Sequence, residues 1–133
     1  MVRREFWRDR PVLVTGHTGF KGGWLATWLL ALGARVTGYA LAPDTTPSYF
    51  AGCGLAGRLT SRLGDVTDGA ALEAALAVAR PSVVFHLAAQ ALVRRSYRAP
   101  VETFATNVLC TARLLEAVRR TPSVESVVVI TSD

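Results

Sequence analysis

Five short β-branched segments alternate along this chain with longer segments rich in alanine and leucine. The short segments are typical of strands, and the longer ones carry apolar residues at helical spacing. Apolar strands separated by helices indicate a parallel sheet with helices on both faces, so we predict a doubly wound α/β fold. The predicted strands span residues 11–15, 35–41, 58–63, 82–87 and 124–131, and the predicted helices span 20–32, 70–80 and 101–120.

The composition indicates one globular domain, which we place at residues 1–133. Half of the residues are hydrophobic, which excludes an intrinsically disordered chain. The 15 Lys and Arg residues outnumber the 10 Asp and Glu residues, but the arginines are scattered. Scattered basic charge does not favour nucleic-acid binding. No apolar run is long enough for a membrane-spanning helix, so we expect no membrane partner.

The first residues and the two cysteines indicate a cytoplasmic setting. Residues 1–7 lack the apolar stretch and small-residue cleavage site of a secretory signal. Cys53 and Cys110 are too few and too far apart in sequence for a metal site or a CxxC redox pair. We therefore expect reduced structural thiols and predict no metal site.

The segment between the first predicted strand and the first predicted helix is rich in glycine. Its sequence is Gly16-His17-Thr18-Gly19-Phe20-Lys21-Gly22. Glycines at such a place let the backbone approach a pyrophosphate, and the helix N-terminus offers free amide donors. This context favours dinucleotide binding over an ordinary turn. Lys21 either reaches the cofactor's phosphates or ribose or is a solvated surface lysine.

The other strand ends carry the remaining candidates, because ligands of such sheets bind at the carboxyl ends of strands. Ala40 stands where an acidic residue would grip the adenosine ribose, so the sequence does not decide between NAD and NADP. Asp65 either accepts a hydrogen bond from adenine or caps a turn. We interpret His86 as a buried structural histidine rather than a proton carrier. Asn107 either holds a neighbouring strand end or faces solvent.

Three further groups have two interpretations each. Trp24 and Trp28 lie on one face of the first predicted helix, and we predict core positions rather than a stacking platform. The pair Arg94-Arg95 either meets a diphosphate or is an exposed basic pair. The terminal Thr131-Ser132-Asp133 places a hydroxyl and a carboxylate at the end of the fifth strand. These residues either take part in catalysis or form an ordinary polar turn, since both would have this sequence pattern.

Taken together, the segments GHTGFKG, GDVTD, HLAAQ, VRRSY, TNV and VITSD resemble the extended short-chain dehydrogenase/reductase superfamily, which has a Rossmann fold. The longer segments GHTGFKGGWL, TGYALAPDTTPS, FHLAAQALVRRSY and VVVITSD are similar to the CDP-glucose 4,6-dehydratases within it. The resemblance covers essentially the whole chain, but only the amino-terminal portion of such an enzyme.

The resemblance implies an NAD-dependent lyase that converts CDP-glucose to CDP-4-dehydro-6-deoxy-glucose. It also implies a homo-oligomer whose subunits pair through the helix at 101–120. Ser132 would hydrogen-bond the sugar 4-oxygen, and Asp133 would act as general acid on the departing C6 hydroxyl. Asp65 and Val66 would hold adenine. The other implied cofactor-binding residues are Gly16, His17, Thr18, Gly19, Phe20, Lys21, Gly22, Leu87, Ala88, Ala89, Gln90 and Asn107.

The chain departs from the family in one respect that bears on activity. No tyrosine is followed four residues later by lysine, so the family's Tyr-x-x-x-Lys pair has no counterpart. The substrate lobe is also missing from these residues. We therefore expect the cofactor-binding portion of a dehydratase, inactive by itself. The alternatives are a non-catalytic NAD(P)-binding module, another sugar-nucleotide epimerase or dehydratase of the superfamily, and a ligand-free interaction fragment.

Overall fold

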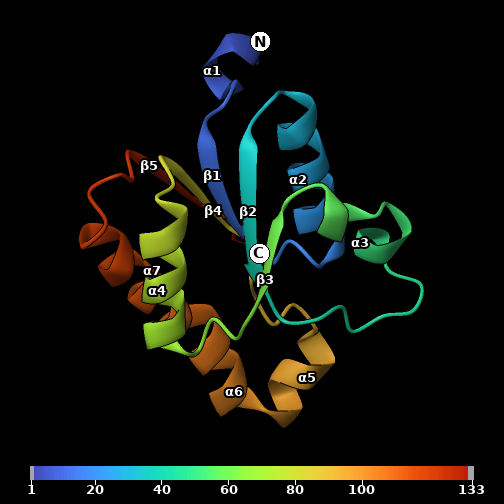
Figure 1. Cartoon of the computed structure of the whole chain (residues 1–133). Coiled ribbons are helices and arrows are strands. Elements are labelled where there is room, and N and C mark those ends of the chain that lie inside the picture. Colours follow the sequence, from blue (N-terminus) through green and yellow to red (C-terminus); the bar gives the residue numbers. More distant parts are fainter. Residues whose placement is uncertain (1, 132–133) are drawn as a thin grey trace.

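A computed structural model describes residues 2–131 of the chain. It contains five strands joined by helical segments (Figure 1). The strands are β1 (Pro11–Thr15), β2 (Arg35–Ala40), β3 (Thr60–Leu63), β4 (Val83–His86) and β5 (Ser126–Val129). The α-helices are α1 (Arg4–Trp7), α2 (Phe20–Ala31), α3 (Tyr49–Gly52), α4 (Gly69–Ala79), α5 (Val93–Arg98), α6 (Pro100–Phe104) and α7 (Cys110–Arg119). A 3₁₀ turn, η1 (Leu55–Gly57), precedes β3, and a π-helical segment, η2 (Ala105–Leu109), joins α6 to α7.

The sheet is wholly parallel, with the strand order β3-β2-β1-β4-β5. The chain runs outward from β1 to β3, crosses over to β4, and then continues outward to β5. The strand order therefore reverses between β1 and β4, which is where ligands bind in doubly wound sheets. The predicted fold class is confirmed, and each predicted strand matches an observed one to within two residues at either end.

Two apolar cores lie on the two faces of the sheet. Figure 1 shows α2 on one side and α4 and α7 on the other. On the α4–α7 side, Leu13, Leu72 and Leu114 are completely buried. On the α2 side, Val14 and Leu29 occupy the equivalent layer. Alternate strand residues face alternate cores, as a sheet covered on both faces requires.

Local chemistry sets the helix ends that frame the site. Asp68 caps α4, because its side chain accepts a hydrogen bond of 3.0 Å from the Ala71 amide. Gly33, with φ of +91°, follows the end of α2 in a left-handed conformation that glycine adopts without strain. Among the described residues, no helix is long and apolar enough to span a bilayer.

The tryptophans of α2 correct one prediction. Trp24 and Trp28 are 54% and 53% exposed, so they are not core residues. They face away from the sheet, because Ala26 and Leu29 occupy the buried face of the same helix. Four-residue spacing identifies a helix face but does not say what that face packs against.

A groove of about 400 Å³ adjoins this exposed face of α2. Its apolar lining includes Phe6 and Trp7 of α1, Leu25 and Trp28 of α2, and Phe85 of β4. Trp7 packs against Phe85, with ring centroids 6.1 Å apart. Helix α1 therefore covers part of β4 on the same face of the sheet as α2.

Candidate functional site

The candidate site lies at the carboxyl ends of β1, β2, β3 and β4. Backbone hydrogen bonds join the residues that follow these strands. The Gly16 amide donates to the Tyr39 carbonyl at 3.0 Å, and the Gly64 amide donates to the Ala40 carbonyl at 2.9 Å. The Leu87 amide donates to the Thr15 carbonyl at 3.2 Å. The three predicted cofactor-binding segments are therefore brought to one edge of the sheet.

The glycine-rich loop is packed so closely that side chains do not fit at two of its glycines. Gly16 has a φ of +79°, and a Cβ there would lie 2.9 Å from the Ala88 nitrogen. A Cβ on Gly22 would lie 2.1 Å from the Gly16 carbonyl oxygen. These contacts press the loop, the start of α2 and the end of β4 together. The loop therefore has the close backbone packing that a dinucleotide fingerprint requires.

The N-terminus of α2 is free to receive an anion. Gly19 is its N-cap residue and is extended, with φ of −78° and ψ of 171°, and no side chain caps the helix. The amides of the first turn have no partner within the helix. Such amides, together with the helix dipole, favour a phosphate group. The residues present thus fit a dinucleotide diphosphate, with the Phe20 and Lys21 side chains exposed beside it.

His17 belongs to this loop, but its side chain points into the protein. The ring is completely buried, and its Nε2 lies 2.8 Å from Ser61 Oγ. It lies over Gly38, where an added Cβ would be 2.2 Å from the ring. Burial lowers the pKa of His17 to about 4, so the imidazole is neutral near pH 7. Only the main chain of His17 is available to a ligand on the outer side of the loop.

Two neighbouring residues hold the edge of the site through local bonds. Thr18 Oγ1 donates to the Leu41 carbonyl at 2.8 Å, which ties the loop to the end of β2. Asp65 Oδ1 accepts from the Thr67 amide at 2.8 Å, so one of its two carboxylate oxygens caps a local turn. The Asp65 residue is exposed, whereas Val66 is 6% exposed and packs in the core below.

The end of β4 is held from both sides. Thr15 Oγ1 accepts from the amides of Leu87 and Ala88, each at 3.2 Å. Asn107 Oδ1 accepts from the Gln90 amide at 2.8 Å, and Asn107 Nδ2 donates to the Gln90 carbonyl at 3.0 Å. Asn107 therefore holds a neighbouring strand end, which was one of its two predicted roles. Ala89, between these anchored residues, is exposed.

His86 has the buried structural character that the sequence predicted. It is 2% exposed, and burial lowers its pKa. Its Nδ1 lies 2.7 Å from Thr15 Oγ1, and its Nε2 lies 3.1 Å from Thr111 Oγ1. The sequence analysis missed both threonines, because neither stands next to His86 in the chain.

The predicted arginine pair lies on the helix that follows the segment 87–90. Arg94 and Arg95 are on the exposed helix α5, and Arg95 forms an ion pair with Glu102. Ser132 and Asp133, the predicted catalytic residues, lie outside the described residues.

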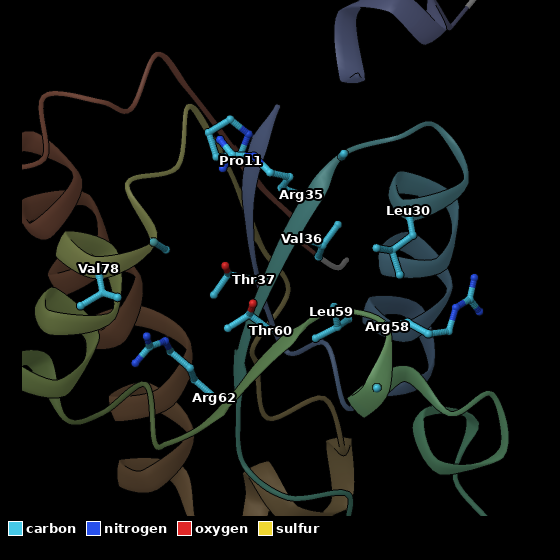
Figure 2. A pocket seen from close by; sticks show the side chains of 13 residues that line it. Pro11, Leu30, Arg35, Val36, Thr37, Arg58, Leu59, Thr60, Arg62 and Val78 are labelled. Atoms are coloured by element: carbon cyan, nitrogen blue, oxygen red, sulfur yellow. The ribbon is translucent and has the colours of Figure 1, made fainter. Parts of the chain in front are cut away.

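A second hollow lies at the opposite, amino ends of β1 and β2. Figure 2 shows this pocket, with Pro11 and Arg35 at one side and Arg58 and Arg62 extending to opposite sides of β3. Its volume is about 620 Å³. The Nε of Arg62 is buried without a hydrogen-bond partner in the described part of the chain. None of the described residues predicted for cofactor binding lines this pocket.

A search against protein-family models decides the family. The model for GDP-mannose 4,6 dehydratase matches residues 13–132. The chain belongs to this family. The matched residues include all three segments at the carboxyl edge of the sheet. The candidate site therefore lies within the region that the family shares.

Among curated relatives, the family member CDP-glucose 4,6-dehydratase of Salmonella typhimurium is 48% identical over 133 residues, which are 100% of this chain and 37% of that protein. Among solved structures, MoeE5 in complex with UDP-glucose and NAD is 37% identical, with a TM-score of 0.72, over 92% of this chain and 36% of that one. UDP-glucose 4-epimerase from Brucella ovis in complex with NAD is 28% identical, with a TM-score of 0.76, over 90% of this chain and 35% of that one. The chain thus spans little more than a third of the length of these relatives.

Proposed function

We propose that the chain binds NAD at the carboxyl edge of its sheet. The observation that carries this proposal is the loop at Gly16, Gly19 and Gly22, which leads into the uncapped N-terminus of α2 beside the strand-order reversal. The diphosphate would lie against the amides of the first turn of α2. Two of the similar structures are complexes with NAD, which supports this cofactor.

We further propose that the longer protein is a CDP-glucose 4,6-dehydratase, and that residues 1–133 form its cofactor-binding domain. The 48% identity to the Salmonella typhimurium enzyme is spread over an alignment that includes the whole chain. The first turn of α2 would hold NAD, which when bound would supply the hydride transfer that dehydration of the sugar needs.

The chain's own residues would bind and orient the cofactor. Asp65, exposed at the end of β3, would accept a hydrogen bond from adenine, and the buried Val66 would support that edge from below. The segment 87–90, fixed by Thr15 and Asn107, would lie along the ribose and nicotinamide. Two roles that the family resemblance implies stay predictions. Ser132 would hydrogen-bond the sugar 4-oxygen, and Asp133 would act as general acid at C6.

Calorimetric titration of the chain with NAD tests the binding proposal. We expect saturable binding, and we expect Gly19→Ala to weaken it by about tenfold or more, since one lost charge-assisted hydrogen bond costs about 1.5–3 kcal/mol. This variant should fold, because the φ of −78° suits alanine and the new Cβ would touch only the Gly16 carbonyl, at 3.4 Å. Its methyl group would occupy the approach to the amides.

The matched control is Gly52→Ala, whose new Cβ would have no atom within 4 Å. It should bind NAD as the unaltered chain does. Absence of saturable binding by the unaltered chain, or equal affinity of the Gly19→Ala variant, would contradict the proposed site.

The proposal includes a cytoplasmic homo-oligomer that pairs through residues 101–120. Leu109 and Leu115 are 47% and 46% exposed on this helical segment, which leaves apolar surface for a second copy. The two free cysteines support a reducing compartment. Sedimentation of the chain and of a Leu115→Glu variant tests the pairing: we expect the variant to shift the chain toward monomer, and an unchanged distribution would contradict it.

A further inference from the structure

A continuous series of hydrogen bonds joins the end of β1 to the helix that carries Asn107. It runs from Thr15 Oγ1 to His86 Nδ1 at 2.7 Å, and from His86 Nε2 to Thr111 Oγ1 at 3.1 Å. Thr111 Oγ1 then donates to the Asn107 carbonyl at 2.8 Å. Thr15 and His86 are both almost completely buried, so these bonds lie in the protein interior.

The bonds at the two threonines fix the tautomer of His86. Thr15 Oγ1 accepts from the amides of Leu87 and Ala88, although the Leu87 amide is shared with the Thr15 carbonyl. A hydroxyl has two acceptor sites and one proton, so the Thr15 proton must go to His86 Nδ1. Thr111 uses its own proton on the Asn107 carbonyl and can only accept from His86. Both ends therefore require neutral His86 with its proton on Nε2.

The far end of the series is the π-helical segment η2, which contains Asn107. The wider π turn changes which groups bond to the carbonyls of η2. The Ala105 carbonyl accepts from the Cys110 amide and also from the Cys110 thiol, the latter at 2.9 Å. The Thr111 hydroxyl bonds to the Asn107 carbonyl. A single π turn inside an α-helix rotates the residues before it relative to those after it, and such turns are frequent at functional sites. Here the turn aims the Asn107 side chain at Gln90.

We propose that His86 is a positioning residue: as the Nε2–H tautomer it connects Thr15 to Thr111, fixes the π turn, and thereby holds Asn107 on the main chain of Gln90. One histidine thus sets both anchors of residues 87–90, since Thr15 holds the start of this segment and Asn107 holds its end. His86 moves no proton in this role, and its lowered pKa agrees with a neutral ring. Only the consequence for NAD rests on the proposed function.

Nitrogen NMR of the chain tests the tautomer directly. We expect the Nε2 resonance of His86 in the range of a protonated ring nitrogen and the Nδ1 resonance in the range of an unprotonated acceptor. A merely space-filling histidine would have no such preference. The opposite tautomer, or an even mixture, would overturn the proposal.

Hydrogen exchange at the Gln90 amide tests the connection, because this amide donates to Asn107. Thr111→Val removes the acceptor for His86, and we expect its Gln90 amide to exchange about tenfold faster, the equivalent of one hydrogen bond of about 1.4 kcal/mol. Thr111→Ser keeps the hydroxyl and should restore the protection. Leu13, in the central strand, provides the amide that reports global unfolding.

Thr121→Val is the matched control. Thr121 makes the same kind of bond, from its hydroxyl to the carbonyl of Ala117 at 2.8 Å, but among the described residues the histidines hydrogen-bond to other side chains. Loss of Gln90 protection in this variant equal to that in Thr111→Val would overturn the proposal, as would unchanged protection in Thr111→Val. NAD titration of the same variants separates the two claims: a chain with the expected tautomer and exchange pattern that binds no NAD refutes the proposed function alone.

Discussion

The side chain of Asn107 satisfies both polar groups of the Gln90 backbone, through an acceptor bond of 2.8 Å and a donor bond of 3.0 Å. The two residues are 17 positions apart along the chain. The pairing stabilises an irregular segment at the strand end, where backbone groups would otherwise lack partners inside the protein.

Replacement of Asn107 should therefore loosen this segment and destabilise the chain. Asn107→Ala leaves both Gln90 groups without their partner, and we expect the free energy of unfolding to fall by about 1–3 kcal/mol. Urea unfolding measures this change. Val108→Ala, at the next and 58% exposed position, is the control and should cost much less. Equal losses for the two variants would show that the amide does not hold the segment.

Gly22 should tolerate no side chain. Gly22→Ala would bring its Cβ to 2.1 Å from the Gly16 carbonyl oxygen, which belongs to tightly packed backbone and cannot move aside as a flexible side chain would. We expect a loss of at least about 2–3 kcal/mol in the free energy of unfolding, by analogy with overpacked cores. Thermal unfolding compared with Gly57→Ala, which has open space around the new Cβ, measures it. A Gly22→Ala chain as stable as this control would contradict the close approach.

The stability of the chain should fall between pH 6.5 and about 4. The pKa of His17 is lowered from 6.5 to about 4 by burial, so the unfolded chain binds a proton in this range that the folded chain does not. The contribution is fully present above pH 6.5 and is lost as pH falls; it amounts to ~3 kcal/mol.

Urea unfolding across this pH range, for the chain and for His17→Gln, isolates the effect. The variant should have a smaller slope, and the slope that is left would come from His86, whose pKa is also lowered. Glu116 has a pKa lowered to about 2, chiefly by its hydrogen bond to Arg119, so its contribution to stability is fully present above its ordinary pKa of 4.5 and changes with pH only below that value. Identical slopes for the two proteins between pH 6.5 and 5 would exclude His17 as the cause.

The two faces of α2 should respond differently to truncation. Leu29 is 2% exposed, and Leu29→Ala should cost about 2–5 kcal/mol. Trp28 is 53% exposed, and Trp28→Ala should cost less than about 2 kcal/mol, well under the 3–5 kcal/mol of a buried tryptophan. Chemical denaturation of both variants checks this. A larger loss at Trp28 than at Leu29 would mean that the tryptophan face is covered in solution.

Local patterns were sufficient to predict the strands, α2 and α4, because each depends on residues close together in the chain. The glycine-rich loop was predictable for the same reason: its residues are consecutive, and its place between β1 and α2 follows from the alternation of strand and helix.

Features that depend on distant partners were not predictable. The burial of the His17 side chain depends on Gly38 and Ser61, which reach it only after β2 and β3 pair. The sequence of η2 has no Gly or Pro that would indicate an irregular helix, so the continuous helix predicted at 101–120 lacks the π turn that is present. Exposure of Trp24 and Trp28 depends on which residues of α2 pack against the sheet.

The tryptophans lie on one face of the sheet, so the two faces differ in tryptophan fluorescence. Trp24 and Trp28 lie on α2, and Trp7 packs on the same side of the sheet. Excitation of the indole rings would produce fluorescence from that side of the sheet. Helix α7 and the π turn contain no tryptophan and would not contribute to it. If a nicotinamide quenched this tryptophan fluorescence, the signal would contain no tryptophan emission from the Asn107 side. A fluorophore attached to α7 would therefore report on that side independently.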